Sequence, residues 1–204
     1  MRNVIRIFAG LLGLIVIAGL GGLIFLKTAA NGFSARADPS ALETIAARMA
    51  RKLALPAGAG EKQNPVPDSK EVLEEAMAHW ADHCAVCHSN DGSGQMQMGH
   101  QMYPPAPDMR KEETQKLTDG ELFYIIENGI RLTGMPAWGG TKAGGESSWK
   151  LVRFIRHLPQ LSTQEVAQMA KLNPKSPEDF EQEQRAEQFL NGQTPAEATK
   201  QHKH

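Results

Sequence analysis

The only two cysteines of the chain stand with a histidine in one short run, Cys84-Ala85-Val86-Cys87-His88. Cysteines at this spacing lie on one face of a helix, where both thiols can add to the vinyl groups of a single porphyrin. The histidine that follows is then placed under the iron as the proximal ligand. The spacing predicts one c-type haem, attached through Cys84 and Cys87 and ligated by His88.

Three other interpretations explain less of this motif. A structural disulfide between Cys84 and Cys87 leaves His88 without a role, and so short a loop is more typical of redox-active pairs. A thioredoxin-like motif belongs to a βαβ context, which the pattern of the chain does not indicate. A zinc site needs a second ligand pair, and His83 lies too near the cysteines in sequence to complete a good tetrahedron. We therefore favour haem.

A second axial ligand has to come from elsewhere in a chain that contains nine methionines. We predict Met135, in Gly134-Met135-Pro136-Ala137-Trp138, because a rigid loop after a helix can fold back over the other haem face. Three methionines nearer the motif are more typical of gap filling or haem-edge contacts, and one histidine is a competing ligand: Met96, Met98, Met102 and His100.

Helical patterns surround these residues and would position them. A helix is expected over 69–88, with both thiols on its apolar side. A loop rich in Gly, Met and Pro follows over 90–108. A helix that starts with a capping box is expected over 118–128, and another over 147–158, before Pro159. No strand-like alternation and no internal repeat stands out, so the predicted fold is all-α.

The beginning of the chain has the length and composition of a membrane span. No charged residue occurs over 7–26, which is long enough for a helix to cross the bilayer core. Arg2 and Arg6 precede this stretch, whereas Lys27 and Arg36 follow it. The positive-inside rule then puts the N-terminus in the cytoplasm and the rest of the chain outside.

A cleaved signal peptide is the alternative to an anchor. Small residues at 28–30 and at 35–37 have the spacing that a signal peptidase accepts. The apolar region of a signal peptide normally runs only about 7–15 residues, which is shorter than this one. We favour an uncleaved anchor, and both alternatives deliver the remainder of the chain across the membrane.

Composition divides the chain into an anchor, a short helix with a Pro/Gly-rich linker, a haem domain, and a helical extension with a polar tail: 1–30, 31–68, 69–160 and 161–204. The short helix, over 41–55, either docks on the haem domain, which we favour because its charges are few, or rests on anionic lipid. The linker over 56–67 would let the haem domain sit away from the membrane. In the extension, helices are expected to start at Ser162 and at Ser176, the second ending near Asn191-Gly192.

Over 72–158 the sequence resembles the class I cytochrome c family in its small bacterial single-haem form. The motif at Cys84 and the Met135-Pro136 pair carry this resemblance, which implies a small helical domain around one haem. In that family the helix before the haem motif crosses the last helix of the domain. Trp80 stands where an aromatic is usual and Ala76 where glycine is common, and the expected partners on the last helix are Leu151 and Phe154.

The resemblance also implies contacts around the haem. Family members use a proline carbonyl to accept a hydrogen bond from the proximal histidine, which fixes the ring and raises its donor strength. Pro107 stands at this position, followed by Met109 on the haem face, although Pro104 and Pro105 leave the register open. Apart from the resemblance, we expect the side chains of Arg131 and Trp138 to reach the haem propionates.

With both axial positions filled by His88 and Met135, the iron would have no open site, which favours electron transfer over catalysis. We therefore expect a one-electron carrier, not an enzyme, on the periplasmic side of a bacterial inner membrane. Its partners would be the membrane and redox proteins, since a net charge of -1 does not indicate nucleic acid. A haem subunit of a larger oxidase or dehydrogenase is one alternative, and a haem-based sensor in which Met135 dissociates is the other.

Overall fold

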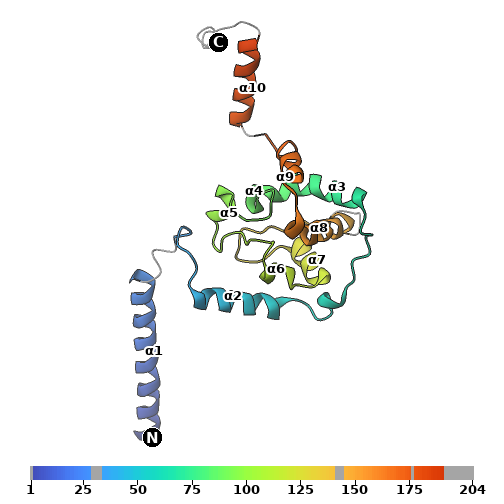
Figure 1. The fold of residues 1–204 in the computed structure, drawn as a ribbon. Helices are drawn as coiled ribbons and strands as arrows, with labels where there is room; N and C mark the ends of the chain where they lie inside the picture. The colour runs from blue at the N-terminus through green and yellow to red at the C-terminus, as the bar shows by residue number, and fades with distance from the viewer. Residues whose placement is uncertain (1, 29–33, 141–144, 176, 191–204) are drawn as a thin grey trace.

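Helices and turns make up the part of the chain that the structure describes. The computed structural model describes residues 2–28, 34–140, 145–175 and 177–190 (Figure 1). No strand occurs among these residues, and most of the helices gather into one body from which the two ends of the chain project. The all-α prediction is therefore confirmed.

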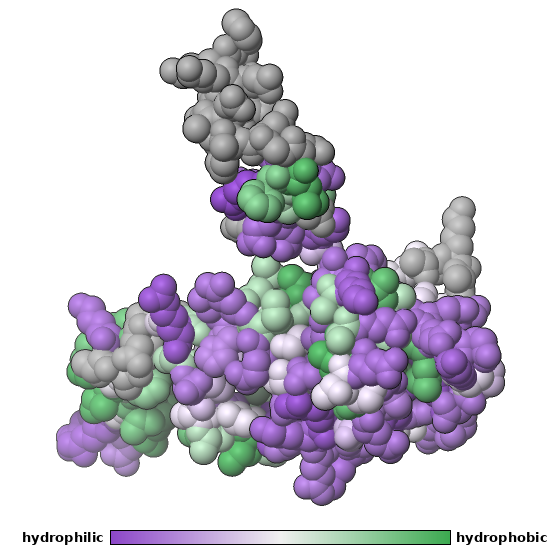
Figure 2. Space-filling view, turned by 45° about the horizontal axis from the view of Figure 1, so that its top comes forward, coloured by the Kyte–Doolittle hydropathy of each residue, from purple (hydrophilic) through white to green (hydrophobic). Residues whose placement is uncertain are grey.

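The N-terminal helix, α1 (Arg2–Thr28), is long and apolar enough to cross a membrane. It is not buried against any other element, and it points away from the helical domain (Figure 1). Figure 2 shows its apolar side chains gathered at one side of the molecule, whereas the surface of the domain is largely hydrophilic. These properties make α1 a candidate membrane anchor, and a signal sequence near the N-terminus is the alternative.

The next helix, α2 (Ala41–Ala54), begins at the residue that the sequence predicts. Ser40 is its N-cap: the Glu43 amide donates to the Ser40 hydroxyl (3.3 Å), and the Ser40 amide donates to the Glu43 carboxylate (2.7 Å). This reciprocal pair satisfies two amides that a helix start otherwise leaves without partners. No residue of α2 is buried, and its contact with the domain includes an ion pair between Arg48 and Glu113 (3.6 Å).

The Pro- and Gly-rich segment after α2 is attached to the domain and does not run free of it. Its short 3₁₀ turn, η2 (Ala59–Glu61), buries Ala59, and Val66 is buried farther along. The Arg153 guanidinium donates twice to the Val66 carbonyl, over 3.0 and 2.7 Å. The expected spacing of the domain from the membrane by this linker therefore has no support in the structure, because distant side chains hold its backbone.

The haem motif lies at the end of a helix whose geometry changes partway along. α3 (Lys70–His79) continues into a π-helical turn, η3 (Trp80–Cys84), and then into α4 (Ala85–His88). The extent agrees with the helix expected over 69–88, but the wider turn shifts the register of everything that follows it. A single regular helical stripe therefore does not run from α3 to the cysteines.

The core forms where α3 crosses α8 (Glu146–His157). Ala76 and Trp80 of α3 and η3 are almost fully buried, as are Leu151 and Phe154 of α8. The ring centroids of Trp80 and Phe154 lie 5.4 Å apart. These are the residues that the resemblance pairs across the two helices. α8 ends at His157, and a short 3₁₀ turn that contains Pro159, η4 (Leu158–Gln160), follows it.

Three further helices complete the domain: α5 (Gln97–His100), α6 (Glu112–Gln115) and α7 (Asp119–Asn128). The capping box predicted for α7 is present, with Thr118 as N-cap and Glu121 as its reciprocal partner. The helix expected from residue 147 instead starts at Glu146, after Gly145 in the left-handed conformation (φ 78°). Helix ends are the least certain part of a sequence-based prediction, since neighbouring residues can serve as caps.

The C-terminal extension is partly built into the domain. α9 (Thr163–Ala170) starts at a capping box formed by Ser162 and Glu165, as expected, and its Met169 is fully buried in the core. α10 (Pro177–Leu190) projects away from the domain (Figure 1). The start at Ser176, the end near Asn191-Gly192 and the polar tail lie outside the described residues.

Candidate functional site

The two thiols and the imidazole of the motif lie at the end of η3 and along α4, beside the core. Cys84, Cys87 and His88 are each partly buried, and neither cysteine is in a disulfide. The His88 ring packs on Trp80, with ring centroids 5.8 Å apart. The core that α3 and α8 form thus lies against the motif on the side of Trp80.

Burial sets the protonation of this group of residues. It raises the pKa of Cys84 to about 12, with a further contribution from Cys87, whose own pKa burial also raises. Both cysteines are therefore thiols at neutral pH, which disfavours a reactive thiolate pair. Within the described residues, no group of three or more His, Cys, Asp or Glu side chains is placed to hold a metal ion, so the zinc alternative gains no support.

His88 has the ionisation state that a metal ligand needs. Burial lowers its pKa, and the Pro107 carbonyl acts in the opposite direction. The neutral imidazole therefore dominates at neutral pH, and only this form can coordinate a metal. Its Nδ1 atom is buried but makes no hydrogen bond of ordinary geometry. The structure thus brings Pro107 to His88, with the hydrogen bond between them not fully formed.

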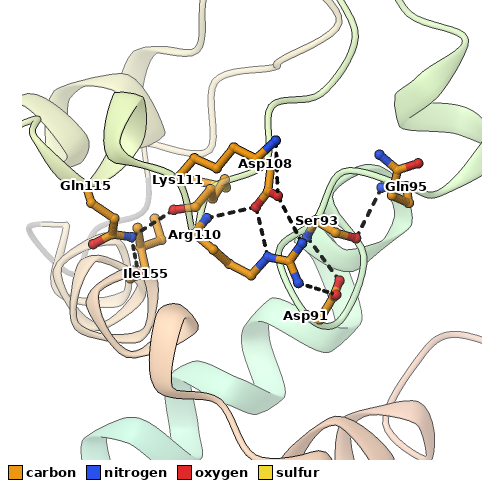
Figure 3. Close-up of polar contacts among 9 residues, drawn as sticks. Asp91, Ser93, Gln95, Asp108, Arg110, Lys111, Gln115 and Ile155 are labelled. Atoms are coloured by element: carbon orange, nitrogen blue, oxygen red, sulfur yellow. Dashed lines mark hydrogen bonds and ion pairs between the residues drawn. The ribbon is translucent and has the colours of Figure 1, made fainter.

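The loop segments around His88 and Pro107 are joined through one arginine (Figure 3). The Arg110 guanidinium donates to both carboxylate oxygens of Asp108, over 2.9 Å in each case, and to Asp91 over 2.8 Å. This arrangement holds the pKa of Asp108 below its usual range. Backbone bonds run alongside: the Met109 amide donates to the Gly92 carbonyl (2.8 Å).

The side chain of one glutamine joins the same loop to the core through hydrogen bonds. The Gln115 side-chain amide donates to the carbonyls of Met109 (2.8 Å) and of Ile155 in α8 (2.9 Å), as Figure 3 shows. Sequence reasoning did not single out Asp91, Arg110 or Gln115. The acidic residues of the Gly-, Met- and Pro-rich loop and the arginine just after it were the available signal, but they do not identify which carboxylate the arginine reaches across the loop.

Another loop contact requires glycine. Gly99 of α5 lies so close to the haem motif that a Cβ atom there would stand 2.0 Å from the Cys87 carbonyl oxygen. The Gly99 carbonyl in turn accepts from the Ala106 amide (2.9 Å). Only a residue without a side chain permits this approach. The loop over 90–108 is therefore packed against the motif.

The Met135 loop is held by its own hydrogen bonds. The Ile130 amide donates to the Met135 carbonyl (3.1 Å), and the Met135 amide donates to the Thr133 hydroxyl (3.1 Å). Gly129 opens the loop with a φ of 64°, and a Cβ there would lie 2.7 Å from the Met135 carbonyl oxygen. Met135 itself is half-buried. These bonds link the backbone on both sides of Met135 within the loop.

The remaining predicted site residues differ in exposure. Met102 packs against Gly134, next to Met135, since a Cβ on Gly134 would stand 2.2 Å from the Met102 sulfur. Trp138 is partly buried and lies edge-on to His83, with ring centroids 5.3 Å apart. Met109 packs against the core. Four others are exposed: Met96, Met98, His100 and Arg131.

The donor set of this site suits a haem c. Two neutral thiols and a neutral imidazole with a buried and unsatisfied Nδ1 are groups that such a cofactor uses, and the thioether of Met135 stays the predicted second ligand. Residues 71–155 match the family model described as Cytochrome C oxidase, cbb3-type, subunit III. A comparison with curated proteins gives no match. The matched segment begins in α3, ends in α8 and includes the whole motif and the Met135 loop.

Proposed function

Residues 71–155 form a cytochrome c domain of the class I type, and on this premise we propose that the protein is a one-electron carrier with a single haem c. Cys84 and Cys87 bind the haem covalently, and His88 and Met135 ligate its iron. The observation that carries the proposal is the complete Cys84–His88 motif within the matched segment. Haem c supplies a one-electron ferric/ferrous couple when bound.

Each protein group has a distinct part in this proposal. His88 presents a neutral imidazole, and the nearby Pro107 carbonyl would orient the ring. The Met135 thioether is a soft donor that favours the ferrous state, which raises the potential relative to two histidines. If His88 and Met135 both ligate the iron, no open position would be left for a substrate, which suits the site to electron transfer.

A haem subunit of a respiratory oxidase is the second candidate function. One observation favours it specifically: the matching family model describes a subunit of a cbb3-type oxidase. The protein would then pass electrons within one complex. A catalytic partner that co-purifies in a fixed ratio after gentle solubilisation indicates a subunit, whereas recovery of the cytochrome alone indicates a free carrier.

The proposal places the protein at a bacterial inner membrane. α1 is its single membrane anchor, and the basic residues before it, Arg2 and Arg6, lie on the cytoplasmic side. The cytochrome domain is then periplasmic, where covalent haem attachment to exported proteins takes place. Redox proteins on that side of the membrane are its electron donors and acceptors.

Visible spectra of the purified protein, expressed with a c-type haem maturation system, test the proposal. We expect sharp bands in the reduced state, haem that stays attached after denaturation, and the weak far-red ferric band of methionine ligation. Met135→Ala should keep the haem but lose that band. Met98→Ala, at a methionine that is 54% exposed, is the matched control and should leave the spectrum unchanged.

Other spectroscopic results would change the identity of the second ligand, the proposed function or the haem assignment itself. An unchanged far-red band in Met135→Ala with loss of the band in Met102→Ala would identify Met102 as the ligand. Carbon monoxide binding by the reduced native protein would support the sensor alternative, since the ligand then has to displace Met135. A protein without attached haem would contradict the proposal altogether.

A further inference from the structure

α2 is held with its polar side toward the cytochrome domain. Thr44, Arg48 and Arg51 recur at three- and four-residue intervals, so they share one face of the helix. Arg48 pairs with Glu113 just inside α6, and Arg51 is half-buried near Glu121 of α7. Burial lowers the pKa of Arg51, and the Glu121 carboxylate opposes this shift. The face of α2 that meets the domain is thus charged.

The face of α2 that points away from the domain is apolar. Leu42, Ile45, Met49 and Leu53 also follow the spacing of one helix face, and they are 77%, 56%, 60% and 82% exposed. A helix that packed on a soluble domain would turn this face inward. The docking that we favoured from the sequence is therefore correct only for the polar face, and it leaves an unpartnered apolar stripe on the outside.

The position of α2 indicates what covers this stripe. Residues 29–40 join α1 to α2 and span at most about 40 Å when fully extended. In Figure 1, α2 runs across the axis of α1 at the level of its C-terminal end, with the cytochrome domain on the other side of α2. A bilayer that contains α1 therefore has its surface close to the outer, apolar face of α2.

We propose that α2 is an interfacial helix whose stripe of Leu42, Ile45, Met49 and Leu53 inserts into the outer surface of the lipid bilayer. This inference rests on the proposed membrane anchoring by α1. Helices with one apolar and one charged face bind in this way, with the apolar side chains at the boundary between headgroups and acyl chains. Lys52, which neighbours the stripe on the helix, lies at the level of anionic headgroups.

Lipid fits this stripe better than a protein partner does. Three of its four members are aliphatic side chains, whereas the cores of protein interfaces are enriched in aromatic residues, methionine and arginine. The tether to α1 also keeps the bilayer at a high effective concentration without any partner. Insertion of α2 would fix α6 and α7 on the membrane side of the cytochrome domain and keep α3 and α4 farther from the lipid (Figure 1).

Spin labels on the full-length, haem-containing protein test the proposal. Met49→Cys places a label on the stripe, and Ala47→Cys, also exposed but on another face of α2, is the matched control. The proteins are reconstituted in vesicles of phosphatidylcholine and phosphatidylglycerol. Collisions with oxygen, which partitions into hydrocarbon, are compared with collisions with a water-soluble nickel chelate present on both sides of the membrane. We expect the oxygen-to-nickel ratio to be several-fold higher at Met49 than at Ala47.

Two results would overturn the proposal, and one control separates it from the proposed function. Equal ratios at the two positions in membrane-bound protein mean that α2 lies in water. A label at Met49 that is immobilised and shielded from both reagents means that protein, a second copy or another subunit, covers the stripe. The chain without an added cysteine should take up no label; if it does, Cys84 and Cys87 are free and the haem attachment itself fails.

Discussion

At the scale of single residues, Arg110 joins two loop segments that flank the haem motif. Asp91 follows His88 closely in the chain, and Asp108 follows Pro107 directly, so the bonds from Arg110 to both carboxylates connect the two sides of the proximal loop. The Asp108 side chain is only 16% exposed, which protects these bonds from solvent more than an open surface pair. We therefore expect this network to position the Pro107 carbonyl against His88.

Asp108→Asn should destabilise the protein at neutral pH by about 1 kcal/mol, because it removes the charge that Arg110 binds. The pKa of Asp108 is lowered in the folded state, chiefly by its hydrogen bond from Arg110. A group of this kind stabilises the fold above its unfolded pKa of about 3.9, and this contribution is lost as the pH falls through the lower folded pKa. The difference from wild type should therefore be largest at neutral pH and vanish in acid.

Urea unfolding at several pH values measures this effect. Glu112→Gln is the matched control, because it removes an exposed carboxylate paired with Lys116 and should cost no more than about 0.5 kcal/mol. A difference between Asp108→Asn and wild type that persists below about pH 2 would contradict the expected role of the charge.

The residues of the motif itself could be predicted, because their chemistry depends on spacing along one short run. The residues that hold the motif could not. Arg110 donates a hydrogen bond to Asp91 across a folded loop, and the Gln115 side chain donates one to the Ile155 carbonyl in another helix. The tertiary fold brings such pairs together, and the local sequence around one partner does not predict the other.

At the scale of helices, α9 differs most from its expected place. The sequence suggested an extension outside the haem domain, but α9 packs against the core of the domain. Its Met169 is fully buried and belongs to the same cluster as Trp80 and Phe154. A second contact joins the same elements: His157 at the end of α8 lies 2.8 Å from the Glu165 carboxylate of α9. We infer that α9 contributes to the core and that the projecting part of the extension begins after it.

Met169→Ala should reduce the free energy of unfolding by about 2–4 kcal/mol, the usual cost of deleting a buried methionine side chain and leaving a cavity. Met98→Ala, which truncates an exposed methionine, should change it by less than about 0.5 kcal/mol. Denaturant unfolding of the haem-containing proteins measures both. Equal stability of the two variants would mean that α9 is not part of the cooperative fold.

The helix starts that carry a capping box were predicted well, because a capping box is a local pattern. Thr118 and Ser162 begin helices as expected, and Ser40 caps the helix expected over 41–55. The π-helical turn at Trp80–Cys84 was missed, since no residue type marks a change to the wider hydrogen-bonding register. The attachment of the Pro- and Gly-rich segment was missed for a related reason: its hydrogen bonds to the domain join residues far apart in the sequence. Arg153 donates to the Val66 carbonyl, and the Asn64 side-chain amide donates to the Trp149 carbonyl (3.0 Å).

At the scale of the whole molecule, the core is one-sided. Aromatic residues make up only 6% of the chain, and the buried cluster lies where α3 crosses α8. The residues that would contact haem are only partly buried, among them Cys84, His88, Met135 and Trp138. The protein chain alone therefore leaves these side chains only partly buried, and we expect bound haem to bury them.

Preventing haem attachment should therefore cost the domain much of its stability. In the double variant Cys84→Ala/Cys87→Ala no thioether bond can form, and the side chains that would contact haem lose their partner. A ligand that binds only the folded state contributes several kcal/mol when it is retained at high effective concentration. We expect the melting temperature, followed by circular dichroism, to fall steeply or the cooperative transition to disappear.

Val86→Ala is the control, because it changes an exposed residue (45%) inside the same motif and leaves both thiols and His88 in place. This variant should keep its haem and its melting temperature. A double cysteine variant that lacks haem and still melts cooperatively at the temperature of the native protein would mean that the crossing of α3 and α8, with α7 and α9 around it, is sufficient for the fold. The haem would then not be needed for a stable core, and the partial exposure of Met135 and Trp138 would need another explanation.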